Sequence, residues 1–262
     1  MDLQLEGKRV LVTRASKGIG LAIVKAFTAE GASVVATARR STSELERTGA
    51  VFIPADLSTS DGPQRVVETA LAQNPQLDVL VNNAGGGDPS DELLEDPFSG
   101  DDDTWANVFA LNLNAAVRTT RAALPALAKA RGAVVNISSS SARDPHTAPL
   151  PYAAAKAALN TFTRGLAEAA ARMGVRINAV TPGGTRTELL VGEDGYAAQI
   201  AARMGVEHSD LIATLPQQIG MLTDELIDPD EIARAVVLLA SPTMPSAIGS
   251  NWTVHGGAMK SA

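Results

Sequence analysis

Short β-branched runs alternate with longer segments rich in alanine and leucine along almost the whole chain. Runs such as RVLVT, from Arg9 to Thr13, have the length of strands, and the segments between the runs have the spacing of amphipathic helices. This alternation predicts a parallel sheet with helices on both faces. The runs are continuously apolar, which is typical of strands covered on both sides. The predicted fold class is therefore α/β, a Rossmann-type doubly wound parallel sheet in a three-layer αβα arrangement.

The individual elements can be located from the same pattern. We expect strands at Arg9–Thr13, Ser33–Thr37, Val51–Ile53, Asp78–Val81, Ala133–Ile137, Arg176–Val180 and Asn251–Val254. We expect helices at about Ile19–Glu30, Ser60–Leu71, Thr104–Lys129, Tyr152–Met173 and Pro229–Leu239. No break in composition and no low-complexity linker divides the chain, so residues 1–262 are predicted to form a single domain.

Two stretches between these elements are irregular. Asp88–Asp103 contains eight acidic residues and no basic one, and residues 186–228 are mixed, with a helical patch near Tyr196–Met204. Doubly wound sheets bind ligands outside the carboxyl ends of their strands, where both stretches begin, so both are candidates to border a pocket. Residues 186–228 are predicted to form a substrate lid. For the acidic stretch we favour a solvated loop that caps the next helix through Asp102 or Asp103.

Charge and composition exclude several functions. The net charge of −7 argues against a nucleic-acid partner. There is no cysteine, and the three histidines, His146, His208 and His255, are far apart, so no metal site is predicted. The N-terminal segment lacks the apolar core of a signal peptide, and no apolar run is long enough to span a membrane. We therefore expect a cytoplasmic protein without membrane contact.

The stretch VTRASKGIG, Val12–Gly20, joins the first predicted strand to the first predicted helix. Gly18 and Gly20 would let the backbone approach a pyrophosphate, which binds at a helix N-terminus. Alone, the pattern fits an ordinary strand–helix turn equally well. Arg14 stands where such a turn is expected to begin with glycine.

Tyr152 and Lys156 are four residues apart on a predicted helix, so their side chains share one face. A free tyrosine, with a pKa of about 10, is a poor acid near neutrality, and a nearby ammonium lowers that pKa. Such a phenol can give a proton to a carbonyl oxygen as hydride arrives. Ser139 follows a buried strand, where a hydroxyl can bond to a substrate oxygen. Taken singly, a surface tyrosine beside a solvated lysine and serines in a turn explain the same residues.

In their order along the chain, these marks resemble the short-chain dehydrogenase/reductase family, over about Lys8–Gly257. Ser139 lies 13 positions before Tyr152, which is the usual spacing in the family. The residues that carry the resemblance are Thr13, Gly18, Gly20, Asp56, Asn82–Gly85, Asn112, Ser139, Tyr152, Lys156, Pro182, Gly183 and Thr187.

The resemblance implies a catalytic set of Ser139, Tyr152, Lys156 and Asn112. Tyr152 would be the acid in reduction and the base in oxidation, and Ser139 would polarise the carbonyl. Lys156 would bind the nicotinamide ribose and depress the pKa of Tyr152. Asn112 would hold a water that links Lys156 to solvent. The implied cofactor site comprises Thr13, Arg14, Ser16, Lys17, Gly18, Ile19, Gly20, Arg39, Asp56, Leu57, Asn83, Ala84, Gly85, Tyr152, Lys156, Pro182, Gly183, Thr185 and Thr187.

The cofactor is predicted to be NADP(H) rather than NAD(H). An NAD site needs an acid after the second strand for the ribose 2′-hydroxyl, whereas an NADP site needs positive charge for the 2′-phosphate. Ala38 occupies the position of the family's acid, and Arg39 and Arg40 follow it. Guanidinium groups suit phosphate, so Arg39 and Lys17 are the expected clamp.

Two residues depart from the family's pattern. Arg14 replaces the first loop glycine, whose lack of a Cβ permits a tight turn. We favour an outward-pointing, tolerated side chain; a second interpretation is an extra clamp on the 2′-phosphate, and a third is weakened cofactor binding. His255 stands where the family usually has aspartate, in a stretch that commonly packs at a subunit interface, so it is expected to affect assembly.

The predicted function is that of an NADPH-dependent carbonyl reductase, which is a reversible secondary alcohol dehydrogenase. An alternative is a reductase of 3-oxoacyl thioesters on acyl carrier protein, with Lys129, Arg131 and Arg172 meeting the acidic carrier. An alternative of another class is a non-catalytic dinucleotide sensor, which would not need a polarised phenol. The expected partners are a small-molecule carbonyl or alcohol substrate and further copies of the chain, as a tetramer or dimer.

Overall fold

The computed structural model describes residues 1–86, 93 and 96–259. Within these residues, seven parallel strands form one sheet in the order β3-β2-β1-β4-β5-β6-β7. The strands are β1 (Arg9–Thr13), β2 (Ser33–Ala38), β3 (Val51–Pro54), β4 (Val79–Asn82), β5 (Ala133–Ile137), β6 (Arg176–Pro182) and β7 (Asn251–Val254). The predicted doubly wound α/β fold is confirmed, and each expected strand agrees with the structure to within two residues at either end.

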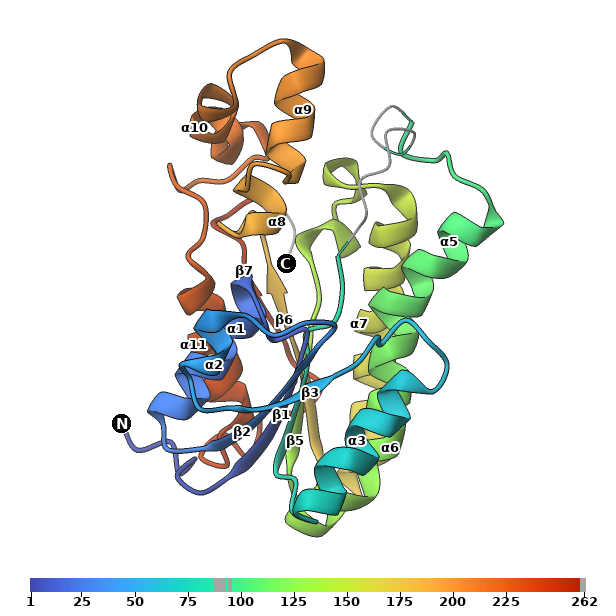
Figure 1. The fold of residues 1–262 in the computed structure, drawn as a ribbon, viewed down its shortest axis with the longest axis vertical. Helices are drawn as coiled ribbons and strands as arrows, with labels where there is room; N and C mark the ends of the chain where they lie inside the picture. Colours follow the sequence, from blue (N-terminus) through green and yellow to red (C-terminus); the bar gives the residue numbers. More distant parts are fainter. Residues whose placement is uncertain (87–92, 94–95, 260–262) are drawn as a thin grey trace.

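Helices cover both faces of the sheet (Figure 1). Helices α1 (Gly18–Ala29) and α11 (Pro229–Ala240) pack together on one face. Helices α3 (Gly62–Gln73), α6 (Ala115–Ala130) and α7 (Leu150–Ala171) cover the other. The remaining helices are α2 (Ser43–Glu46), α5 (Asp102–Phe109), α8 (Glu188–Val191), α9 (Tyr196–Met204) and α10 (His208–Gln218).

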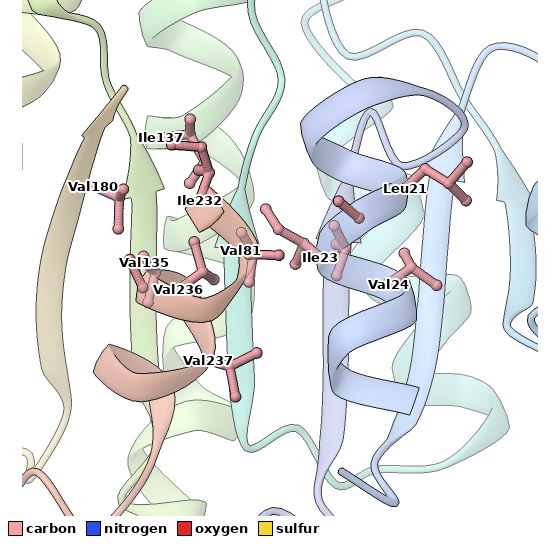
Figure 2. Close-up of a cluster of buried hydrophobic side chains, with 14 of the residues drawn as sticks. Leu21, Ile23, Val24, Val81, Val135, Ile137, Val180, Ile232, Val236 and Val237 are labelled. Atoms are coloured by element: carbon pink, nitrogen blue, oxygen red, sulfur yellow. The ribbon is translucent and has the colours of Figure 1, made fainter. Parts of the chain in front are cut away.

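The core forms two apolar clusters, one on each side of the sheet. In β1, Val12 belongs to the cluster under α1 and α11, whereas Leu11 belongs to the cluster under α3 and α6. Side chains alternate between the faces of a strand, so a strand covered on both sides must be apolar throughout. Figure 2 shows the first cluster, in which Ile23 of α1 and Val236 of α11 lie against the strands.

The long helix expected at Thr104–Lys129 is interrupted. Between α5 and α6 the backbone makes a π-helical turn, Ala110–Asn114, around the fully buried Asn112. The side-chain amide of Asn112 donates to the carbonyl of Val108, 2.9 Å away, and also engages Gly86. A π-turn of this kind often marks a functional position.

The expected helix cap in the acidic stretch is wrong by one residue. Asp101, rather than Asp102 or Asp103, accepts a hydrogen bond from the amide of Thr104 at 2.9 Å. Asp102 and Asp103 lie in the first helical turn, where their charges complement the helix dipole. Residues 88–92, 94 and 95 of this stretch lie outside the described residues.

The carboxyl ends of β1, β4, β5 and β6 meet at one edge of the sheet, and the strand order reverses between β1 and β4. Helices α8, α9 and α10 stand above this edge (Figure 1). Loops at such a reversal leave a crevice in which doubly wound sheets bind ligands. In the described part of the chain, no helix is both long and apolar enough to cross a membrane.

Candidate active site

A cavity of about 450 Å³ opens at this edge of the sheet. Eleven of the predicted site residues line it: Arg14, Ile19, Asn83, Gly85, Ser139, Tyr152, Lys156, Pro182, Gly183, Thr185 and Thr187. The volume suits a small ligand together with part of a dinucleotide.

The loop from β1 to α1 forms one end of the cavity. The hydroxyl of Thr13 accepts hydrogen bonds from the amides of Asn83 and Ala84, at 2.8 and 2.9 Å, and so ties β1 to the segment after β4. Helix α1 then starts at Gly18, which has a φ of +51°. The first turn of α1 contains no acidic residue, so no carboxylate in that turn offsets the positive end of the helix dipole.

Gly20 allows the close packing of this loop. A Cβ at Gly20 would lie 2.2 Å from the carbonyl oxygen of Arg14 and 2.6 Å from the side-chain nitrogen of Asn83. Both neighbours are fixed, because Asn83 itself donates to the carbonyls of Thr13 and Arg14. The glycine is therefore required by packing inside the loop.

Ser139, Tyr152 and Lys156 come together in the wall of the same cavity. Ser139 follows β5, and Tyr152 and Lys156 lie one turn apart near the start of α7. The Ser139 side chain lies within hydrogen-bonding reach of the Tyr152 hydroxyl. The Lys156 ammonium lies 5.8 Å from the centre of the Tyr152 ring and donates to the carbonyl of Ile137 at 2.8 Å.

Asn112 lies behind this group. Its side chain accepts from the amide of Gly86 and donates to the carbonyl of Gly86, each at 2.9 Å. A Cβ at Gly85 would lie 2.7 Å from the Lys156 nitrogen and 2.9 Å from the Asn112 side-chain oxygen. Asn112 thus holds the Gly85–Gly86 backbone against Lys156, a role that the sequence did not indicate.

Burial has the largest effect on the pKa values of Tyr152 and Lys156. Burial raises the pKa of Tyr152, whereas the hydrogen bond from Ser139 and the charge of Arg14 lower it by a smaller amount. The sequence-based expectation of a lowered tyrosine pKa therefore does not hold for the protein's own groups. Burial, together with the positive charge of Arg14, lowers the pKa of Lys156 to about 7, so the ammonium that was expected to act on the phenol is itself destabilised.

The other expected cofactor residues do not line the cavity. Arg39, directly after β2, and Lys17 are exposed, and Ser16 is half-buried. Asp56 is exposed; hydrogen bonds from Ser58 lower its pKa, and the charge of Arg39 adds to this. Leu57 is buried in the core under α3, so only its backbone can reach a ligand. Thr13, Gly18, Gly20 and Ala84 are not lining residues either, but they pack within the loops that carry lining residues such as Asn83 and Thr187.

Arg14 differs from the favoured expectation. It has a left-handed φ of +49°, and its side chain lines the cavity and donates to the carbonyl of Gly85 instead of pointing outward. His255 follows β7 with its backbone packed on Gly183, and its Nδ1 is buried with no hydrogen-bond partner among residues 1–86, 93 and 96–259.

Several cavity residues escaped the sequence analysis. Ser141, Asp144 and His146 come from the short 3₁₀ turns after β5, and the apolar cover comes from Leu189, Leu190, Ile200, Leu215, Ile219 and Met259. Irregular turns have no hydrophobic period, so no sequence signal marks these positions.

Comparisons with known proteins agree with this geometry. Residues 8–194 match the family described as short chain dehydrogenase. The uncharacterized oxidoreductase YvrD of Bacillus subtilis is 34% identical, with 100% of both chains covered. L-fucose dehydrogenase of Mus musculus is 34% identical, with 96% of this chain and 88% of that protein covered.

A similar solved structure is L-sorbose reductase of Gluconobacter frateurii, described as complexed with NADPH and L-sorbose. Its TM-score is 0.90 at 28% identity, with 100% of both chains covered. The whole sheet and its surrounding helices are thus shared with an oxidoreductase that binds a nicotinamide dinucleotide. Together with the family match, these findings show that the chain is an oxidoreductase of the short-chain dehydrogenase/reductase family.

Proposed function

We propose that this protein is an NADPH-dependent reductase that transfers hydride to a ketone carbonyl, and that it oxidises the matching secondary alcohol in reverse. The observation that carries the proposal is the meeting of Ser139, Tyr152 and Lys156 in one cavity at the strand-order reversal. A polarised phenol beside a buried lysine serves proton transfer to an oxygen atom.

The residues present fit a nicotinamide dinucleotide. The N-terminus of α1, free of acids in its first turn, suits the pyrophosphate, and the cavity beyond it suits the nicotinamide. When bound, the reduced nicotinamide supplies the hydride. Lys156 would bind the neighbouring ribose hydroxyls, and the same cavity is lined by Asn83, Gly85, Pro182, Gly183, Thr185 and Thr187.

The substrate oxygen is held between Ser139 and Tyr152. Ser139 donates a hydrogen bond to it, and Tyr152 delivers a proton to it as charge develops on the oxygen. The raised pKa of Tyr152 keeps the phenol protonated and ready to donate in the direction of reduction. Asn112 acts as a positioning residue through the Gly85–Gly86 backbone. The water relay through Asn112 stays a prediction.

A sugar or another polyhydroxylated carbonyl compound is the substrate class that we favour. The relatives include a fucose dehydrogenase and a sorbose reductase. Beyond Ser139 the cavity offers Ser141, Asp144 and His146, which can bind hydroxyl groups. Residues 186–228, which carry Leu189, Leu190, Tyr196 and Leu215, are proposed as the lid over this substrate. A cytoplasmic, oligomeric protein also stays a prediction.

A screen of NADPH consumption tests the function. The panel contains ketoses, simple ketones, diketones and 3-oxoacyl thioesters, with Tyr152→Phe as the blank. Turnover of one class that the blank abolishes supports the proposal. Preference for acyl thioesters would favour the carrier-protein reductase, and tight NADPH binding without any turnover would favour the sensor.

Arg39 is expected to select NADPH over NADH. Replacing it with glutamine removes a charge-assisted bond to the 2′-phosphate, so the Kd of NADPH should rise roughly 10- to 100-fold, while that of NADH stays unchanged. The difference should shrink at high salt. Fluorescence titration of both cofactors measures it. Arg40→Gln is the matched control. If that variant, and not Arg39→Gln, selectively loses NADPH affinity, the 2′-phosphate is bound by Arg40 and not by Arg39.

The affinity for NADPH should fall as the pH rises above 7. Lys156, with a pKa of about 7, loses its proton in the free protein, whereas an anionic cofactor favours the ammonium. Binding above pH 7 therefore takes up a proton, and the Kd should rise by up to about tenfold per pH unit. Titrations between pH 7 and 9 avoid the ionisation of the 2′-phosphate, whose pKa is about 6. Lys156→Met should flatten the profile, and a flat profile in the parent would contradict the assignment.

A further inference from the structure

Arg14 lines the cavity and has a backbone conformation that residues with a Cβ rarely adopt. Its φ of +49° lies in the left-handed region, which costs free energy for a residue with a Cβ. From the end of β1 its guanidinium reaches the segment after β4, where it donates to the carbonyl of Gly85. A Cβ at Gly86 would lie 2.7 Å from Nη1, so the guanidinium rests directly on the Gly85–Gly86 backbone.

Within the described residues, the charged and titratable groups that act on Arg14 include no carboxylate. These groups are the phenols of Tyr152 and Tyr196 and the guanidinium of Arg39, and burial raises the pKa of the Tyr152 phenol. No ion pair to Arg14 occurs among residues 1–86, 93 and 96–259. Although the residue as a whole is exposed, burial of the guanidinium against the cavity walls is the main cause that lowers its pKa. A cation held in a cavity without a counter-ion is suited to an anionic ligand.

The direction of the Arg14 side chain indicates which phosphate group of the cofactor it can reach. In the sheet, β1 lies between β2 and β4. Arg39 follows β2 on one side, whereas the Arg14 guanidinium lies at the end of β4 on the other side, in the same cavity as Tyr152 and Lys156. The N-terminus of α1 lies between these two ends, because α1 follows β1 directly. The Arg14 side chain is thus bonded on the β4 side of the groove and lines the cavity, which Arg39 does not, although the charge of Arg39 still acts on it.

We propose that Arg14 is a ligand of the cofactor's pyrophosphate, which it binds on the side opposite the N-terminus of α1 after exchanging the Gly85 carbonyl for a phosphate oxygen. This inference rests on the proposed function. A carbonyl is a neutral acceptor, and a pyrophosphate oxygen is a charged one, so the exchange strengthens the bond. The pyrophosphate occurs in NADPH and NADH alike, so Arg14 adds affinity without selecting between them.

Direct binding measurements on five proteins test the proposal: the parent, Arg14→Met, Arg14→Gly, Arg14→Lys and Arg39→Gln. The Kd values of NADPH and NADH are measured by fluorescence titration at low and high salt. Arg14→Met should weaken both cofactors by the same factor, about tenfold or more, and should reduce the salt dependence of both. Arg39→Gln should weaken NADPH alone. Arg14→Lys, which keeps the charge, should recover part of the loss.

Arg14→Gly guards against a failure to fold, because glycine adopts the observed φ without strain. It should melt at the parent temperature or above and still show the equal loss for NADPH and NADH. A loss confined to NADPH would make Arg14 a 2′-phosphate ligand and overturn the proposal. Unchanged or tighter binding of both cofactors to Arg14→Met and Arg14→Gly would also overturn the proposal, because Arg14 would then either not contact the cofactor or hinder its binding. A parent that binds neither dinucleotide would refute the proposed function itself.

Discussion

Tyr152→Phe is expected to lower kcat for carbonyl reduction by about 10²- to 10⁴-fold, the usual contribution of a general acid. The substitution deletes one hydroxyl and leaves the aromatic ring against Lys156. Ser139 keeps its place, so the substrate oxygen loses its proton donor and keeps one hydrogen bond. NADPH binding should stay close to that of the parent. Steady-state kinetics with the best substrate of the screen, together with NADPH titration, separate the two effects.

The chain offers a matched control for this experiment. It contains two tyrosines, Tyr152 and Tyr196, and both line the cavity. Tyr196→Phe deletes the same hydroxyl from another lining residue, in helix α9, and should alter KM more than kcat. If Tyr196→Phe abolishes turnover and Tyr152→Phe does not, the acid has been assigned to the wrong tyrosine.

The architecture was largely predictable because it depends on patterns that are local in sequence. Continuous apolar runs such as that of β1 can be buried only when both faces are covered, and this fixes a parallel sheet with two helical layers. The proximity of Ser139 and Tyr152 could be expected once the family's order of residues was recognised. Both follow from short segments whose ends meet at one edge of the sheet.

The parts that could not be predicted depend on tertiary surroundings. The direction of Arg14 is set by the carbonyl of Gly85, which lies 71 residues away in the chain. The raised pKa of Tyr152 follows from burial, which a pair of residues on one helix face does not reveal. Asp144 and His146 reach the cavity from 3₁₀ turns without any periodic pattern. Each of these features nevertheless bears on binding or specificity.

Gly20→Ala is expected to cost the protein both stability and cofactor binding. The new methyl group would lie 2.2 Å from the Arg14 carbonyl and 2.6 Å from the Asn83 side chain, so the loop after β1 must move. Overpacking of this kind costs about 1–3 kcal/mol, and occasionally more. The displaced loop no longer presents the N-terminus of α1 correctly, and we expect the Kd of NADPH to rise by about 100-fold. Urea unfolding and fluorescence titration measure the two effects.

Gly165→Ala is the matched control, because it adds the same methyl group in helix α7, where, apart from its chain neighbours and the nearby backbone of its own helix, no described atom lies within 4 Å of the new Cβ. Alanine is favoured over glycine inside a helix by about 1 kcal/mol, so this variant should be slightly more stable than the parent and bind NADPH equally well. The contrast separates the effect of a methyl group from the effect of its place. Parent-like stability and parent-like Kd in Gly20→Ala would show that the loop tolerates a Cβ at this position, and the close packing of Gly20 on the Arg14 carbonyl would then not be what shapes the pyrophosphate site.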